Sequence, residues 1–549
     1  MFDEFLQVNL ANLNWKGRAL ERMFALGKVL KDPRHVRARV AGVYARRRRA
    51  ARAAASTGGT TTFFDAFWDR YDRPPRILHV GNIANNAYLS AKLLNESGFD
   101  CDVICHDYYH VMGCPEWEEA EFDVERVDQL RPDWASMDLG GYQRPTWFAQ
   151  GPQQLCIDYL SARRRGDARR AQTLWRRLSV ANRTRPSTHG VALARLTDGL
   201  RRAWRRVSRR RFGTVRSPTV RRTLSDLRRR FKSNFPRRGD TLTSKDWLPY
   251  ASVLDSWAEL FSHYDIVQAY STDVVYPLLT GFRPYLGFEH GTLRDFTLGD
   301  SAICRLTALG YREADHVLIT NGDCLEYAER IGVQSFTPML HPIDDARIAQ
   351  VAAAYDELHR EHGVKYLFLC PLRHDWQVKG TDKYIRALPA LAERIGRDFR
   401  VLMTEWGAQL EESRTLARSL GVDELISWIR PVHRSGLIRL QKSVDVVFDQ
   451  IALPHFGATA PQAIAAGVPV IMSYDPASTE WIIPEPAPVL CAWTPADVVL
   501  AVETALQPEW RGRYARDATR WFAAHHSGAE AVRRLAAAYH SVCDTTGIL

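Results

Sequence analysis

The amino-acid sequence predicts an α/β protein of two doubly wound domains that face each other across a cleft, with a helical N-terminal extension and a basic helical insert. Apolar runs of strand length alternate with segments of helical periodicity in two separate series. Each series opens with a buried-strand pattern, a loop and a helix. The chain has 549 residues, and one hydrophobic core rarely serves more than about 300. We therefore expect two large domains.

Composition places the chain among globular proteins. Its apolar and charged fractions are 46% and 25%, which excludes a largely disordered chain. No apolar run approaches the ~18 residues that cross a bilayer, and the terminus begins with Asp3 and Glu4 instead of an apolar signal core. The nine cysteines are odd in number and irregularly spaced, which favours reduced thiols. We expect a cytoplasmic protein.

Residues 1–62 are predicted to form an amphipathic and basic helical extension. Apolar residues recur at helical spacing between Phe2 and Lys31, and a basic cluster follows from Arg46 to Arg52. Two interpretations stay open: a helix that lies in a membrane interface, and a helix that packs on its own protein. The Gly- and Thr-rich stretch from Ser56 to Thr62 is expected to be a linker.

The first domain is predicted to span residues 63–342. It begins with a strand, a loop, a helix and a second strand at Ile77–Val80, Gly81–Asn86, Ala87–Ser97 and Cys101–Cys105. This order predicts a βαβ unit, hence parallel strands and a right-handed crossover. Further strands are expected at Asp265–Ala269, Tyr285–Gly291 and Val317–Thr320.

A strongly basic insert, residues 161–240, interrupts the first domain. It holds 26 Lys and Arg against four acidic residues, a net excess of 22, which is twice the chain's formal charge of +11. The rest of the chain is therefore net negative. Helix-forming Arg, Ala and Leu dominate the insert, punctuated by Trp175 and Trp204. Its charge suits anionic lipid, nucleic acid or an acidic polymer, and does not choose among them.

The second domain is predicted to span residues 343–525. Its strands and helices are expected at Tyr366–Cys370, Asp382–Ile395, Arg400–Met403, Gln409–Leu420, Ile426–Ile429, Val444–Phe448, Ala460–Ala466 and Pro469–Met472. Doubly wound sheets bind ligands beyond the carboxyl ends of their strands, here in the cleft between the domains. Residues 526–549 are predicted to form a last helix that packs back on the first domain.

Two cations follow the first strand of the second domain. The segment from Cys370 to Gly380 places Arg373 and Lys379 on the loop that enters the next helix. Arginine can hold two oxygens of a phosphate at once and lysine acts as a point charge, so the pair suits a diphosphate. Two solvated loop cations are the alternative for the pair taken alone.

A second segment of this domain predicts an anion site. Phe456 and Gly457 form a turn that leads through Ala458 and Thr459 into the expected helix Ala460–Ala466, which contains Gln462. Free backbone N–H groups and the helix dipole attract an anion there, and Gly457 allows close approach of the backbone. An ordinary loop and helix cap is the alternative. The neighbouring cation pair favours the anion site.

These two segments, in this order and about 80 residues apart, resemble the donor half of the retaining GT-B glycosyltransferases of the group 1 or family 4 type. The likeness covers most of the chain. It implies two Rossmann-like domains, with a nucleotide-sugar as substrate and no other cofactor. It also implies that Arg373 and Lys379 meet the donor phosphates and serve catalysis. The positions that would meet diphosphate and ribose are Gly457, Ala458, Thr459 and Gln462.

The sequence departs from the family pattern at one motif. The family usually has two glutamates, E-x7-E, that bracket the turn. Alignment on Phe456 and Gly457 puts Pro454 and Gln462 at those two positions, so both carboxylates are absent. The neutral Gln462 retains the capacity to hydrogen-bond a ribose hydroxyl.

The resemblance implies ligand-facing residues in the first domain as well. The loop that contains Gly81, Asn85 and Asn86 is similar to the phosphate-side and acceptor-side loop of related enzymes. The segment Glu289–Thr292 resembles their HG segment, which makes His290 a candidate for sugar binding or catalysis. A structural histidine is the alternative.

Further candidates stand at strand ends of the second domain, where the family holds the sugar and the nucleobase. They are Glu405, Trp406, Arg430, Pro431 and Asp449. Strand ends require turns in any fold, so turn-forming residues are the alternative.

The resemblance implies front-face transfer with retention. The leaving diphosphate would accept the proton of the acceptor, while Arg373, Lys379 and the Gly457 turn stabilise developing negative charge. We expect no obligatory metal ion, because no Asp-x-Asp motif stands in a suitable loop.

One group of residues could be mistaken for a metal site. Cys101, Cys105, His106, His110 and Cys114 lie close together in the sequence. Their spacing fits no standard zinc site, so core thiols and loop histidines are favoured.

We predict a glycosyltransferase that moves a sugar from a nucleotide-sugar to a saccharide or lipid-linked acceptor, in cell-envelope or exopolysaccharide synthesis. Its amphipathic start and basic insert would hold it on an anionic membrane surface, at the inner face of the cell membrane. A sugar-nucleotide epimerase and a catalytically degenerate binding or scaffold protein are the alternatives. Nucleic-acid binding is disfavoured, because no recognition module is apparent.

Overall fold

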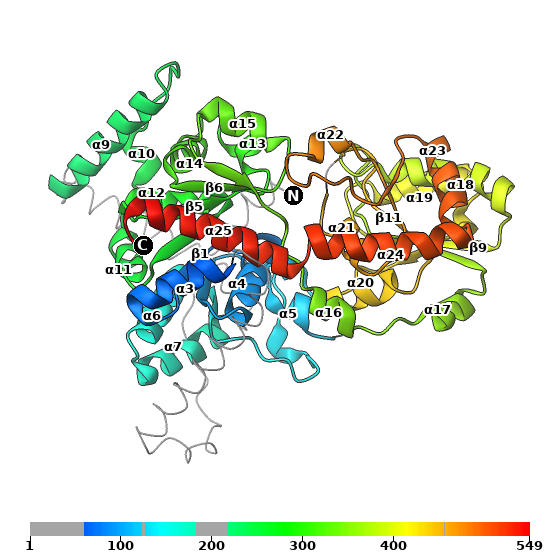
Figure 1. Ribbon diagram of the computed structural model, residues 1–549, viewed down its shortest axis with the longest axis horizontal. Helices are drawn as coiled ribbons and strands as arrows, with labels where there is room; N and C mark the ends of the chain where they lie inside the picture. Colours follow the sequence, from blue (N-terminus) through cyan, green and yellow to red (C-terminus); the bar gives the residue numbers. More distant parts are fainter. Residues whose placement is uncertain (1–59, 123–126, 183–217, 455) are drawn as a thin grey trace, which may run out of the picture.

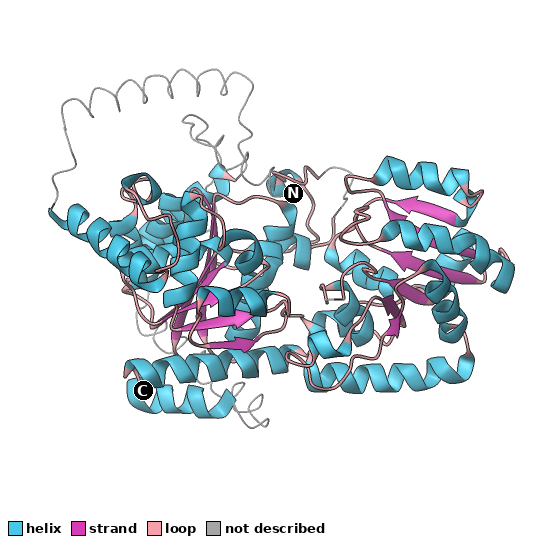
Figure 2. Cartoon of the chain, turned by 90° about the horizontal axis from the view of Figure 1, so that it is seen from above, coloured by secondary structure: helices cyan, strands magenta, loops and turns pink. Residues whose placement is uncertain are grey.

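The computed structural model describes residues 60–122, 127–182, 218–454 and 456–549. Over these residues the chain forms two parallel sheets covered by helices, which lie side by side along the long axis (Figures 1 and 2). The predicted α/β architecture of two doubly wound domains is confirmed. The segment from Phe2 to Lys31, the Arg46–Arg52 cluster, and the middle of the insert with Trp204 lie outside the described residues.

The first sheet has seven parallel strands in the order β3-β2-β1-β4-β5-β6-β7. They are β1 (Arg76–Val80), β2 (Asp100–His106), β3 (Phe148–Gly151), β4 (Ile266–Tyr270), β5 (Tyr285–Phe288), β6 (His316–Ile319) and β7 (Phe336–Pro338). Alternate side chains of β1 enter opposite layers, with Leu78 and Val80 in one hydrophobic cluster and Ile77 in the other. The strand order reverses between β1 and β4, which opens a crevice at their carboxyl ends.

The second sheet has six parallel strands in the order β10-β9-β8-β11-β12-β13. They are β8 (Tyr366–Cys370), β9 (Phe399–Thr404), β10 (Ile426–Ile429), β11 (Val446–Phe448), β12 (Val470–Met472) and β13 (Leu490–Cys491). In β8, Leu367 and Leu369 face one hydrophobic cluster, while Phe368 and Cys370 face the other. The order reverses between β8 and β11, so the loops after these two strands meet at one crevice.

Helices cover both sheets (Figure 1). Those of the first domain are α3 (Thr60–Tyr71), α4 (Asn86–Glu96), α5 (Pro115–Glu119), α6 (Gln153–Arg164), α7 (Ala168–Ala181), α9 (Pro218–Asn234), α10 (Ser244–Trp247), α11 (Leu254–Phe261), α12 (Val275–Thr280), α13 (Thr292–Phe296), α14 (Ala302–Glu313) and α15 (Cys324–Ile331). The chain continues through α16 (Asp345–Gln350), α17 (Tyr355–His362), α18 (Thr381–Ile395), α19 (Leu410–Ser419), α20 (Arg434–Gln441), α21 (Thr459–Ala465), α22 (Pro476–Thr479), α23 (Pro495–Ala505), α24 (Pro508–His525) and α25 (Gly528–Thr546). No helix in the described ranges is both long and apolar enough to cross a membrane.

The described parts of the basic insert belong to the first domain. Helices α6, α7 and α9 enter its hydrophobic core, and their buried residues include Leu160, Leu178 and Phe231. The ring of Trp175 lies 5.1 Å from that of Tyr159 and is half-buried. This tryptophan is therefore a packing residue and not a free platform for stacking bases.

The chain passes between the domains twice. It enters the second domain near Pro342, and after α24 it returns with α25, which lies along α3 and α4 (Figure 1). Tyr539 of α25 is fully buried, and its hydroxyl donates to Gln268 Oε1 at 2.7 Å. The two passages touch, because a Cβ atom on Gly528 would lie 3.1 Å from the carbonyl oxygen of Ile343.

Candidate active site

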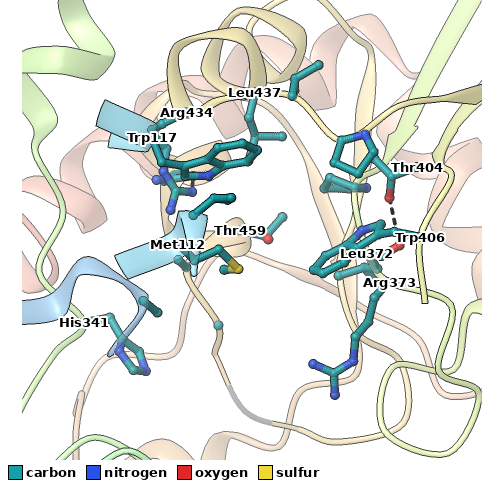
Figure 3. Close-up of a pocket in the computed structure, with 18 of the residues that line it drawn as sticks. Met112, Trp117, His341, Leu372, Arg373, Thr404, Trp406, Arg434, Leu437 and Thr459 are labelled. Atoms are coloured by element: carbon teal, nitrogen blue, oxygen red, sulfur yellow. Dashed lines mark hydrogen bonds between the residues drawn. The ribbon is translucent and has the colours of Figure 1, made fainter. Parts of the chain in front are cut away.

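A cavity of about 320 Å³ lies between the domains, at the carboxyl ends of the strands (Figure 3). Ten of the predicted site residues line it: Asn86, Arg373, Lys379, Trp406, Pro431, Asp449, Gly457, Ala458, Thr459 and Gln462. Five do not: Gly81, Asn85, His290, Glu405 and Arg430. The structure therefore brings the two motifs of the second domain together, and it adds a wall from the first domain.

Lys379, one of the two predicted cations, is half-buried. Its Nζ donates to Gln450 Oε1 at 2.5 Å. Burial lowers the pKa of this lysine, and the Asp449 carboxylate opposes that change. Asp449 in turn has a raised pKa, because its own burial outweighs the attraction of Lys379. The pair thus holds a positive charge in a position where water solvates it poorly, which suits an anionic ligand.

Arg373 leaves the same loop and points into the cavity opposite His341 and Met112 (Figure 3). Its Nε and Nη2 donate to Asp375 Oδ2 at 3.3 and 3.1 Å, and its side chain is 28% exposed. Asp375 also accepts from Val378 N at 3.0 Å, so it shapes the loop as well as holding the arginine. Three of the five guanidinium donors remain for a ligand.

The turn at Gly457 has room for a ligand, but its helix differs from the predicted anion site. A Cβ atom on Gly457 would meet nothing within 4 Å. Helix α21 has only seven residues, and Asp449 Oδ2 already accepts from Ala460 N at 3.0 Å. A helix start capped by a carboxylate attracts an anion weakly. The negative charge of a ligand is therefore met mainly by Arg373 and Lys379.

Trp406 forms the wall beside Arg373 (Figure 3). His374 N donates to Trp406 O at 2.8 Å, which ties the loop after β9 to the loop after β8. The following Gly407 has φ +116°, and a Cβ atom there would lie 2.3 Å from His374 N. Glycine is needed at this crossing, because any side chain would push the two loops apart.

The other strand-end candidates of the second domain face away. Glu405 pairs with Arg414 and does not line the cavity. Arg430 is exposed, whereas its neighbour Pro431 lines the cavity.

His290 lies behind the cavity wall. Its ring stacks against that of His341 at 6.1 Å, and His341 lines the cavity. Burial lowers the pKa of both rings, that of His341 to about 4, so both are neutral at physiological pH. His341 Nδ1 lies 3.1 Å from Asn86 Oδ1, and both residues line the cavity.

Gly81 and Asn85 support the first-domain loop from inside. A Cβ atom on Gly81, whose φ is +90°, would lie 2.4 Å from Asp273 Oδ2. Asn85 is fully buried, and its amide donates to Cys114 O at 3.0 Å. The pattern in the sequence indicated the correct loop, but of the three predicted residues Gly81, Asn85 and Asn86 only Asn86 lines the cavity.

Several lining residues escaped the sequence analysis: His110, Met112, Trp117, His341 and Arg434. His110 and Met112 belong to the connection between β2 and α5, and Trp117 belongs to the five-residue helix α5, which is too short to show a periodic pattern. Arg434 begins α20 and its partner lies in the other domain. No spacing in the sequence predicts these contacts, because they depend on how the two domains pack together.

The cysteines and histidines after β1 form no metal site. Across the described part of the chain, no group of three or more His, Cys, Asp or Glu side chains could hold a metal ion. Cys101, Cys105 and Cys114 are buried free thiols. Burial raises the pKa of Cys114 to about 11, so it stays protonated.

Comparison with known proteins agrees with these motifs. Residues 356–516 match the family Glycosyl transferases group 1. An uncharacterized glycosyltransferase of Methanocaldococcus jannaschii is 33% identical over 95 residues, which is 17% of this chain and 24% of that protein. The match thus spans about a quarter of this curated relative.

Several solved structures have a broadly similar shape. Sucrose-phosphate synthase of Thermosynechococcus elongatus has 12% identity and a TM-score of 0.47, over 86% of this chain and 100% of that chain. The N-terminal domain of trehalose-6-phosphate phosphatase of Candida albicans has 11% identity and a TM-score of 0.49, over 86% and 96%. HepE of Anabaena, in complex with UDP and glucose, has 14% identity and a TM-score of 0.43, over 55% and 81%. The cation pair and the Gly457 turn both lie within residues 356–516, the segment that is similar to the Glycosyl transferases group 1 family.

Proposed function

We propose that the protein is a glycosyltransferase that binds a nucleotide-sugar in the cavity between its domains. One observation carries this proposal: Arg373 and Lys379, which follow β8, line the same cavity as the Gly457 turn, which follows β11. The group 1 match covers all of these residues and supports the proposal. A diphosphate between the cations would offset the cost of burying Lys379.

The proposed reaction is front-face transfer with retention. The bond between the anomeric carbon and the diphosphate breaks, and a new bond forms to the acceptor hydroxyl oxygen. The leaving diphosphate takes the hydroxyl proton, while Arg373 and Lys379 stabilise its charge. Because these two cations supply the positive charge, we propose that no bound divalent ion is needed and that a chelator leaves the activity intact.

The acceptor is proposed to be a saccharide or a lipid-linked saccharide of cell-envelope or exopolysaccharide synthesis. Supporting this, Val111, Met112 and Trp117 give the first-domain wall of the cavity an apolar character. The proposed setting is an anionic membrane surface. Its support is α7, where Arg169, Arg170, Arg176 and Arg177 are exposed and form no ion pair within the described part of the chain.

A binding protein without turnover is a second candidate. Pro454 and Gln462 stand where the family pattern has two glutamates. Such a protein would bind nucleotide-sugars and yet transfer nothing.

The test is a screen of thermal stabilisation by UDP-, GDP-, TDP- and ADP-sugars. We expect one nucleotide to raise the Tm of the wild type and to lose this effect in Arg373→Ala and Lys379→Ala. Arg394→Ala, at the exposed end of α18, serves as the matched control and should respond like the wild type. No stabilisation by any nucleotide would contradict the proposal, and stabilisation with no transfer or hydrolysis would favour the binding protein.

A further inference from the structure

Arg434 of the second domain meets Glu118 of the first at one corner of the cavity. Its Nε donates to Glu118 Oε2 at 2.9 Å and its Nη2 to Glu118 Oε1 at 3.0 Å, which is a two-pronged ion pair. The two side chains are only 14% and 5% exposed. Burial works against the charge on Arg434, but Glu118 outweighs it and raises the arginine pKa. The guanidinium group of Arg434 therefore keeps its positive charge.

The same arginine fixes the orientation of Gln462. Arg434 Nη1 donates to Gln462 Oε1 at 3.1 Å. The amide oxygen of Gln462 thus faces the guanidinium group, and its NH2 group faces the opposite way. Only 6% of Gln462 is exposed, and the residue still lines the cavity.

This corner presents donors of hydrogen bonds to the cavity. Arg434 has five N–H groups, of which three are used by Glu118 and Gln462, so two remain. The Gln462 NH2 group adds two more. Glu118, the acceptor, does not line this cavity but a water-sized one of about 20 Å³ behind it. Arg434 and Gln462 line both cavities, so a ligand in the main cavity meets these two side chains at the corner, and Glu118 lies behind them.

We propose that Arg434 and Gln462 bind an anionic oxygen group of the ligand, a phosphate or a carboxylate, and that Glu118 positions Arg434 for it from the other domain. This inference rests on the proposed function and adds to it. A glutamate at position 462 would accept hydrogen bonds from ligand hydroxyls. The glutamine held by Arg434 donates hydrogen bonds instead. This corner therefore fits a ligand group that accepts them.

The placement also makes the corner depend on both domains. Glu118 belongs to α5 and Arg434 to α20, so the arginine has its partner only when these helices are in contact. Without Glu118, the guanidinium would lose two of its three protein contacts and would no longer hold the Gln462 amide in one orientation. Glu118 is therefore a positioning residue and touches no ligand itself.

The test is calorimetric titration of the full chain with five probes: inorganic pyrophosphate, UDP, GDP, UDP-glucose and UDP-glucuronate. Gln462→Glu should weaken the binding of the probe that occupies the corner at least tenfold. The new carboxylate would take up the free N–H groups of Arg434 and repel an anion. Gln462→Met, which removes the donors without adding charge, should weaken it several-fold. Arg439→Ala, one turn further along α20 and 55% exposed, is the control and should bind like the wild type.

The probes separate the two sources of the anion. A loss confined to UDP-glucuronate assigns the corner to a carboxylate on the transferred sugar. A loss shared by UDP or by pyrophosphate assigns it to a phosphate. Unchanged or tighter binding of every probe by Gln462→Glu, in a variant with the wild-type Tm, would overturn the inference. If pyrophosphate alone binds the wild type and is lost in Gln462→Glu, the corner stands and the proposed function fails; if no probe binds, both fail.

Glu118→Gln tests the positioning role. We expect a higher Kd for the same probe with an unchanged stoichiometry of binding. A purely structural contribution would instead lower the fraction of protein that binds and leave the Kd of that fraction as it was. That second result would remove Glu118 from the inference.

Discussion

The buried surroundings of Lys379 disfavour its positive charge. Burial lowers its pKa from the ordinary value of 10.5 and Arg373 lowers it further, while Asp449 and Asp375 oppose this change. A bound diphosphate would favour the charged form strongly, because it brings negative charge into poorly solvated surroundings. Protonation of this lysine and binding of the ligand are therefore linked.

The linkage gives a pH dependence. As the pH rises from about 7 toward the lowered pKa of Lys379, the free protein loses a proton that binding must restore, so the affinity for a nucleotide should fall. Calorimetry in buffers of different ionisation enthalpy would show proton uptake on binding. Lys379→Met should bind more weakly and lack this uptake, whereas Lys365→Met, a change at an exposed lysine, should keep it. Equal uptake in Lys379→Met would contradict the linkage.

Glu289 is a fully buried carboxyl beside His290. Burial raises its pKa from 4.5 to about 7, although Cys324 Sγ, at 3.1 Å, and Asn321 Nδ2, at 3.3 Å, both donate to it. A carboxyl with a raised pKa keeps its proton in the folded state at a pH where the unfolded state has lost it. Its contribution to stability is therefore present below pH 4.5 and is lost as the pH rises through about 7.

The expected size of this effect is about 3 kcal/mol between those two pH values. Denaturant unfolding over the pH series would measure it. Glu289→Gln keeps the shape of the side chain and removes the titration, so the variant should lack this part of the pH slope. A variant with the full wild-type slope would show that another group is responsible.

At the residue scale, the sequence predicted the part of the site that is local in the chain. Arg373, Lys379 and the Gly457 turn were found because each follows a buried strand within a few residues. Asn85 shows the limit of such patterns, because a motif places the backbone and leaves open which neighbour's side chain reaches the ligand. Arg434 carried no local signal, since its partner Glu118 lies in the other domain.

Among the elements, α4, α5 and the segment before α16 meet at one lysine. Lys92 Nζ donates to Glu119 Oε1 and to Asp344 Oδ2, each at 2.6 Å. All three side chains are less than 20% exposed. Asp344 also accepts from Arg347 N at 3.0 Å and so caps α16. A single cation thus binds two elements of the first domain to the start of the connection between domains.

Replacing this cation should be costly. Lys92→Met would leave two carboxylates close together and poorly solvated, which destabilises by about 3 kcal/mol. Thermal unfolding would record a lower Tm, and acidic pH should recover part of it by protonating one carboxylate. Lys245→Met, at an exposed position of α10, should leave the Tm unchanged. A loss of stability that acid does not relieve would point to lost packing instead of lost charge.

The elements that the sequence predicted are those with long, buried patterns. The expected helix Ala87–Ser97 agrees with α4 to within one residue at each end, and the strand Tyr366–Cys370 agrees with β8. Strands β3, β7 and β13 were not predicted. They have four, three and two residues, too few to show the alternation that marks a strand. Tertiary pairing at the sheet edges determines them.

At the scale of the whole molecule, two passages of chain join the domains, one near Pro342 and one near His526. Two connections restrict relative motion much more than one would, because both must stay intact. The two passages meet at Gly528 and Ile343. The movement that would separate the two sheets is therefore a rotation about that point.

We therefore expect the contact at Gly528 to act as a pivot, so that rotation about it opens and closes the cavity between the domains. Spectroscopic labels at Lys245 and Arg394, both exposed and in different domains, should change their separation when a nucleotide binds. Labels at Ala524 and Ala529, exposed residues at the ends of α24 and α25 that flank the pivot, should move much less. Equal changes for both pairs would mean that the domains slide and do not swing. A protein that swings on a fixed pivot admits large substrates at the mouth of the cavity while the geometry beside the pivot stays constant.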